Sequence, residues 1–98
     1  MKSDLKTHIA SLDENLDLLK TKFGVKKIAI FGSTARGENT AKSDIDIMVE
    51  LNKPMGLIAF VALENYLSKM LGRKVDLTTK KALKPTIKKA ILKEAVYA

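Results

Sequence analysis

The chain has 98 residues, of which 46% are hydrophobic and 30% are charged, and its formal net charge is +7. A chain of this length folds around one hydrophobic core and is too short for a catalytic domain plus a separate substrate-recognition domain. It contains no cysteine, which excludes disulfides and thiolate metal sites.

The hydrophobic pattern predicts a single domain over residues 1–98, with an N-terminal helix within residues 1–24 and a core over residues 25–98. No apolar run approaches the roughly 20 residues that a membrane-spanning helix needs. The N-terminal residues also lack the continuous apolar segment of a signal peptide. We therefore expect a cytoplasmic protein without a membrane partner.

Much of the excess positive charge lies late in the chain. The lysines there are Lys80, Lys81, Lys84, Lys88, Lys89 and Lys93, with Glu94 as the one acid close by in the sequence. Such a surface attracts polyanions or an acidic protein, but lysines also form the usual solvated face of a helix. Charge alone does not decide between these interpretations.

In the N-terminal part, apolar residues recur at alternating steps of four and three over residues 5–23. This spacing predicts one helix that ends at Gly24. Residues 25–31 alternate as expected for a strand covered on both faces. A short helical turn is expected to begin at Ser33, followed by a polar loop over residues 38–42.

The second part predicts a strand over residues 44–51, an apolar helix over residues 57–71 and a strand over residues 74–79. Pro85 suits the first turn of a final helix. The buried stripe of that helix is expected to comprise Ile87, Ile91, Leu92 and Ala95. These elements predict an α/β (α+β) fold, a small mixed β-sheet with flanking helices.

Gly32 and Ser33 follow the first strand at the start of the short helical turn. A glycine there lets the backbone approach a phosphate closely, and the amides that open a helix donate hydrogen bonds to anions. The same dipeptide also fits a plain strand-to-helix turn.

Asp44 and Asp46 lie two residues apart on the second strand, so their side chains project to the same face about 6.5 to 7 Å apart. Carboxylates this close repel one another, and a cation between them relieves that repulsion. All-oxygen ligands favour Mg²⁺. Asp76 is a candidate third acid, on a strand whose Val75 and Leu77 point the other way. Alternatively, such alternation is typical of an amphipathic strand with a solvated face.

The two segments together carry a resemblance to a known family. Gly32-Ser33, a short variable spacer, and Asp44-Ile45-Asp46-Ile47 resemble the pattern of the minimal nucleotidyltransferases (MNT) of the DNA polymerase β superfamily. The likeness extends from about Ile28 to the end of the chain and includes Val75-Asp76-Leu77. It implies a polymerase β-like minimal nucleotidyltransferase fold.

The resemblance also implies a role for each residue of the pattern. Asp44, Asp46 and Asp76 would be catalytic and would hold two Mg²⁺ ions. Gly32 and Ser33 would contact the β- and γ-phosphates of ATP. Arg36 would stabilise phosphate charge, although it could equally be a surface residue paired with Glu38 or Glu50.

The implied activity is transfer of AMP from ATP to a hydroxyl of a partner protein. Stand-alone domains of this size resemble the antitoxins of HEPN/MNT pairs, in which a HEPN-type ribonuclease toxin is adenylylated on tyrosine. Two alternatives stay open: a non-catalytic antitoxin that blocks its partner sterically, and nucleotidyl transfer to a small-molecule hydroxyl. Direct binding of nucleic acid is not expected, because nothing in the chain corresponds to the parts of a polymerase that hold a primer duplex.

Overall fold

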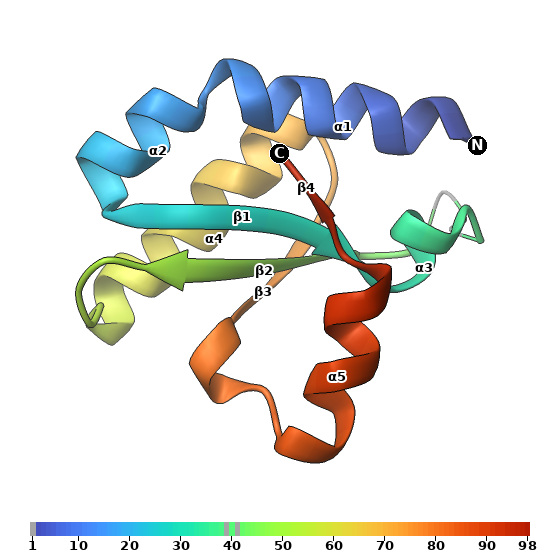
Figure 1. Cartoon of the computed structure of the whole chain (residues 1–98). Coiled ribbons are helices and arrows are strands. Elements are labelled where there is room, and N and C mark those ends of the chain that lie inside the picture. Colours follow the sequence, from blue (N-terminus) through green and yellow to red (C-terminus); the bar gives the residue numbers. More distant parts are fainter. Residues whose placement is uncertain (1, 39, 41) are drawn as a thin grey trace.

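Figure 1 shows the computed structural model of the chain, which describes residues 2–38, 40 and 42–98. The helices are α1 (Lys2–Glu14), α2 (Leu16–Phe23), α3 (Gly32–Arg36), α4 (Leu57–Leu71), the 3-10 helix η1 (Lys80–Ala82) and α5 (Pro85–Glu94). The strands are β1 (Val25–Phe31), β2 (Ile45–Leu51), β3 (Val75–Thr79) and β4 (Val96–Tyr97). The loop predicted over residues 38–42 falls partly on positions 39 and 41, which lie outside the described residues. None of the described helices is both long and apolar enough to cross a membrane.

The strands form one sheet in the order β3-β2-β1-β4. Strand β1 runs antiparallel to both β2 and β4, whereas β2 and β3 are parallel. Parallel neighbours require a crossover connection, and α4 supplies it. The prediction of a small mixed sheet with flanking helices is confirmed.

The core lies between one face of the sheet and helices α1, α2 and α4. Its fully or almost fully buried side chains include Leu12 and Leu19 from the first two helices, Leu63 and Leu67 from α4, and Ile28, Ile30, Ile45, Ile47, Val49, Val75 and Leu77 from the strands. Because side chains alternate along a strand, the residues between these apolar positions project to the opposite face of the sheet. Asp46 and Asp76 are among them.

The prediction of one continuous helix over residues 5–23 is wrong. The chain leaves helical geometry at Asn15, which has φ −103° and ψ 7° and separates α1 from α2. The Asn15 side-chain amide donates a hydrogen bond of 2.8 Å to the carbonyl oxygen of Ser11. Asparagine side chains compete in this way for backbone groups, which favours a helix end over a helix interior.

The C-terminal end also differs from the prediction. None of the residues of α5 is fully buried, and Ile87 is 48% exposed; the helix contacts β1, an inner strand of the sheet, and the short helix α3. The predicted buried stripe is therefore only half-buried at Ile91, Leu92 and Ala95. The two-residue strand β4 was not expected, since two residues are too few to show an alternating pattern.

Candidate active site

Asp46 and Asp76 are the centre of the candidate site. They are direct register partners on the parallel strands β2 and β3. Neighbouring strands lie about 4.8 Å apart, so register partners project side by side from one face of the sheet. The Asp46 side chain is half-buried and that of Asp76 is exposed.

Asp44 lies one residue before β2 begins and two residues before Asp46. Its side chain is 44% exposed, and its Oδ2 atom lies 3.9 Å from Nζ of Lys74. An ion pair this long between exposed groups contributes little to stability. The contact with Lys74 therefore does little to fix the position of Asp44.

The pKa of Asp46 depends on its burial and on the charged side chains near it. Burial raises the pKa of Asp46 above its usual value, and the negative charges of Asp76 and Asp44 raise it further. The positive charge of Arg36 acts in the opposite direction, and Glu94 adds a further small increase. The site therefore concentrates negative charge without enough positive charge to balance it.

Gly32 brings the turn after β1 against this acidic group. Phe31, the last residue of β1, is the register partner of Asp46, so the next residue begins α3 beside the Asp46 side chain. Gly32 has φ +73°, and a Cβ atom at this position would clash with the Asp46 carboxylate. Only glycine fits here without strain. Ser33 follows it in the first turn of α3 and is half-buried.

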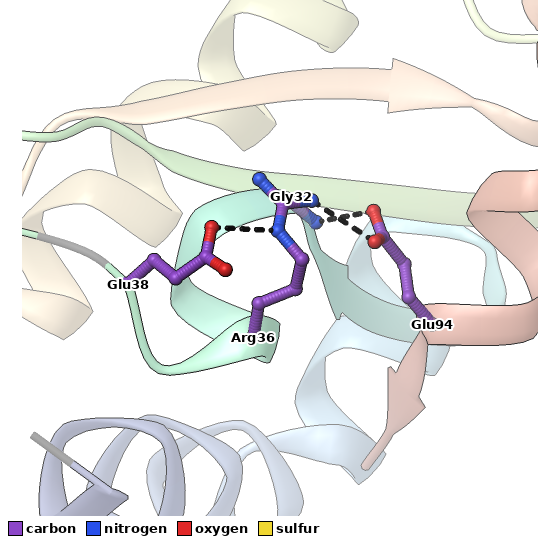
Figure 2. A network of polar contacts seen from close by, with 4 residues as sticks. All are labelled: Gly32, Arg36, Glu38 and Glu94. Atoms are coloured by element: carbon purple, nitrogen blue, oxygen red, sulfur yellow. Dashed lines mark hydrogen bonds and ion pairs between the residues drawn. The ribbon is translucent and has the colours of Figure 1, made fainter.

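Arg36 takes part in a network that Figure 2 shows from close by. Its Nε atom donates to Glu38 at 3.0 Å and its Nη1 atom donates to Glu94 at 3.0 Å. Both contacts raise the pKa of Arg36. The alternative pairing with Glu38 is thus observed, whereas Glu50 lies 3.6 Å from Lys80 instead.

Glu94 is the residue of this region to which the sequence assigned no role. One of its carboxylate oxygens accepts a hydrogen bond from the backbone N–H of Gly32 at 3.0 Å, and the other binds Arg36 (Figure 2). It lies 62 residues from Gly32 in the chain. No local spacing links two residues so far apart, so sequence patterns gave no signal for this contact.

The donor chemistry of the acidic group fits a hard divalent cation, since it offers carboxylate oxygens from adjacent strands and has excess negative charge. As the side chains stand, however, the described residues contain no group of three or more Asp, Glu, His or Cys side chains gathered closely enough to hold a metal ion. Binding of a cation by all three aspartates thus requires side-chain rotation.

A hollow of about 500 Å³ lies where β2 and β3 end, at the opposite end of these strands from Asp46 and Asp76. It is lined by Lys26, Lys53, Lys80, Lys81 and Lys88, by Glu50 and by apolar side chains that include Met55 and Phe60. The chain therefore has an acidic and a basic region at the two ends of the same strands.

Comparison with known proteins gives the class to which this fold and site belong. The family model of the nucleotidyltransferase domain matches residues 12–98. The chain belongs to this family, which confirms the predicted enzyme class.

Relatives from archaea are similar over most of their length. Protein MJ0128 of Methanocaldococcus jannaschii, provisionally named a protein adenylyltransferase, is 52% identical over 87 residues, which cover 88% of this chain and 89% of the relative. Protein adenylyltransferase MntA of Thermococcus cleftensis is 46% identical over 79 residues, which cover 81% of this chain and 80% of the relative.

Solved structures show the same fold. A protein provisionally described as a minimal nucleotidyltransferase superposes with a TM-score of 0.79 at 32% identity, covering 94% of this chain and 93% of the other. A mutant of the MntA–HpeT toxin–antitoxin pair superposes with a TM-score of 0.70 at 25% identity, covering 88% of this chain and 69% of the other. The predicted minimal nucleotidyltransferase fold is confirmed.

Proposed function

We propose that this chain transfers AMP from ATP to a hydroxyl of a partner protein, with Mg²⁺ as cofactor. The observation that carries the proposal is the register of Asp46 with Asp76 beside the Gly32 turn. It combines two adjacent carboxylates with backbone amides at a helix start, which are the groups that hold a metal–triphosphate complex. The family match and the names of the archaeal relatives support the same activity.

Each site residue has a distinct role in this proposal. Asp44 and Asp46 hold the metal ions with the help of Asp76, and Gly32 and Ser33 donate hydrogen bonds to the β- and γ-phosphates. When bound, two Mg²⁺ ions neutralise charge on the attacking and leaving oxygens. Arg36 binds phosphate oxygens through its planar guanidinium.

The reaction is an in-line displacement at the α-phosphorus. The acceptor oxygen forms a bond to this phosphorus, and the bond to the oxygen that bridges to the β-phosphate breaks. Asp76 accepts the proton of the acceptor hydroxyl as general base. The products are the adenylylated acceptor and pyrophosphate.

We propose a protein as acceptor because the chain has an exposed apolar surface on α4. Leu57 and Ile58, in the first turn of α4, are 78% and 87% exposed, and Val61 is 43% exposed. These three residues form what we call the α4 patch; of the residues that line the hollow, Phe60 directly precedes Val61 and Met55 lies two residues before Leu57. An apolar patch beside positive charge suits an acidic, partly apolar protein segment.

The acceptor that the family resemblance suggests is a tyrosine of a HEPN-type ribonuclease toxin, which would make this chain the antitoxin. The solved MntA–HpeT toxin–antitoxin pair supports the antitoxin role. In this role the chain inactivates its partner by covalent modification.

Transfer of label tests the proposal. The chain and its co-purified partner are incubated with ATP labelled at the α-phosphate and with Mg²⁺, and the partner is analysed for added AMP. We expect label on the partner with wild type and with Asp13→Asn, a control on the exposed surface of α1, but not with Asp46→Asn. An unlabelled partner that wild type and Asp46→Asn nevertheless inhibit equally would show steric inhibition instead. Label on a small alcohol in the absence of partner would favour a small-molecule acceptor.

A further inference from the structure

Glu94 connects the end of α5 to the start of α3. Its Oε1 atom accepts the backbone N–H of Gly32 at 3.0 Å, and its Oε2 atom accepts Nη1 of Arg36 at 3.0 Å (Figure 2). The Glu94 side chain is only 26% exposed, so the contact is shielded in part from water. One carboxylate thus binds both donors.

The same two donors are those that the proposed function assigns to phosphate. A carboxylate and a phosphate both present anionic oxygens to backbone amides and to guanidinium groups. A backbone amide has one hydrogen, so Gly32 cannot form a full hydrogen bond to Glu94 and to a phosphate at once. Glu94 also brings negative charge to a site that already contains three aspartates, which disfavours a second anion there.

We propose that Glu94 is an internal competitor for the triphosphate: it occupies the Gly32 amide and Arg36 until a nucleotide displaces it. This inference rests on the proposed function, because it takes Gly32 and Arg36 to be phosphate ligands. Displacement of Glu94 releases the last turn of α5 from α3. The position of α5 then depends on whether nucleotide is bound.

The packing of α5 is consistent with such a release. None of the residues of this helix is fully buried, and an element with few buried side chains opens at low free-energy cost. The chain after α5 is held independently, because β4 pairs with β1 and the N–H of Ala98 donates to the carbonyl oxygen of Ile28 at 3.1 Å. The C-terminal turn of α5 can therefore shift while the end of the chain stays on the sheet.

The first test compares Glu94→Gln with Glu38→Gln. Both substitutions remove one negative charge, and both residues bind Arg36 at 3.0 Å, but only Glu94 also binds Gly32. Equilibrium dialysis with labelled ATP and Mg²⁺ measures affinity, and circular dichroism confirms that each variant is folded. We expect Glu94→Gln to bind ATP about fivefold more tightly than Glu38→Gln. AMP, which lacks the β- and γ-phosphates, should show no such difference.

Equal or weaker ATP binding by Glu94→Gln than by Glu38→Gln overturns the inference and leaves the proposed function intact. If neither wild type nor any variant takes up ATP with Mg²⁺, the proposed function fails as well, so the two failures are distinguishable.

Hydrogen exchange provides a second test that needs no variant. In wild-type protein, ATP with Mg²⁺ should increase amide exchange in residues 91–95. Unchanged or slower exchange there, under conditions in which dialysis shows bound ATP, also contradicts the release of α5.

Discussion

Gly32 lies so close to Asp46 that no side chain fits between them. The backbone of Gly32 has φ +73°, and a Cβ atom there would meet the Asp46 carboxylate. This contact joins the proposed phosphate-binding turn to the acidic group and makes the two parts one site.

The Gly32 contact predicts a specific defect in Gly32→Ala. Gly37→Ala is a matched control, because Gly37 also has φ +73° but nothing lies within 4 Å of its Cβ position. We expect Gly37→Ala to lower the free energy of unfolding by about 1 kcal/mol and to retain AMP transfer. Gly32→Ala should destabilise the protein more and abolish transfer. Urea unfolding and label transfer measure the two effects, and equal behaviour of the two variants would contradict the contact.

The raised pKa of Asp46 predicts how stability depends on pH in the absence of divalent cations. Because the pKa is higher in the folded than in the unfolded protein, the contribution of Asp46 to stability is fully present below the unfolded pKa. It is lost as the pH rises through the folded pKa. Asp46→Asn should therefore be more stable than wild type at pH 7, and this advantage should disappear in acid. Thermal unfolding at a series of pH values in EDTA measures the difference. A less stable Asp46→Asn at pH 7 would contradict the charge repulsion.

In the proposed mechanism Asp76 acts in the chemical step, whereas nucleotide binding depends mainly on Asp44 and Asp46. Asp76→Asn removes the general base, so AMP transfer should fall by about 10²–10⁴-fold. ATP binding should persist because Asp44 and Asp46 remain. Dialysis and label transfer on the same preparation test this, with Asp13→Asn as control. Full AMP-transfer activity in Asp76→Asn would show that Asp76 is not the general base.

The α4 patch should affect partner binding and not nucleotide binding. Ile58→Asp places a charge on a side chain that is 87% exposed, so the fold should tolerate it. We expect affinity for the partner protein to fall roughly 30-fold, as at the centre of an interface, with ATP uptake unchanged. Leu18→Asp on α2, where the side chain is 40% exposed, is the control. Equal partner affinity in the two variants would place the interface elsewhere.

The sequence predicts those parts of the site that depend on local periodicity. A period of two places Asp44 and Asp46 on one strand face, and Gly32 follows a strand whose apolar pattern is clear. The direct register between Asp46 and Asp76 is not local, because it depends on how far α4 carries the chain before β3 begins. The contact of Glu94 with Gly32 spans 62 residues and likewise depends on the whole fold.

The errors at the two ends of the fold also have physical causes. Hydrophobic spacing continues through residues 5–23 without a gap, but the side chain of Asn15 binds the backbone and ends α1. The final helix has an apolar stripe that the described part of the chain leaves incompletely covered, although α5 contacts β1 and α3. Periodicity predicts which residues share a face but not how much of that face is buried.

The most direct test of the central claim is equilibrium dialysis of wild type and Asp46→Asn against labelled ATP, in Mg²⁺ and in EDTA. The arrangement of Asp46 and Asp76 beside Gly32 predicts that wild type binds ATP only when Mg²⁺ is present and that Asp46→Asn does not bind under either condition. ATP binding by wild type that is equally strong in EDTA, or no binding in Mg²⁺, would contradict a metal-dependent nucleotide site on this face of the sheet.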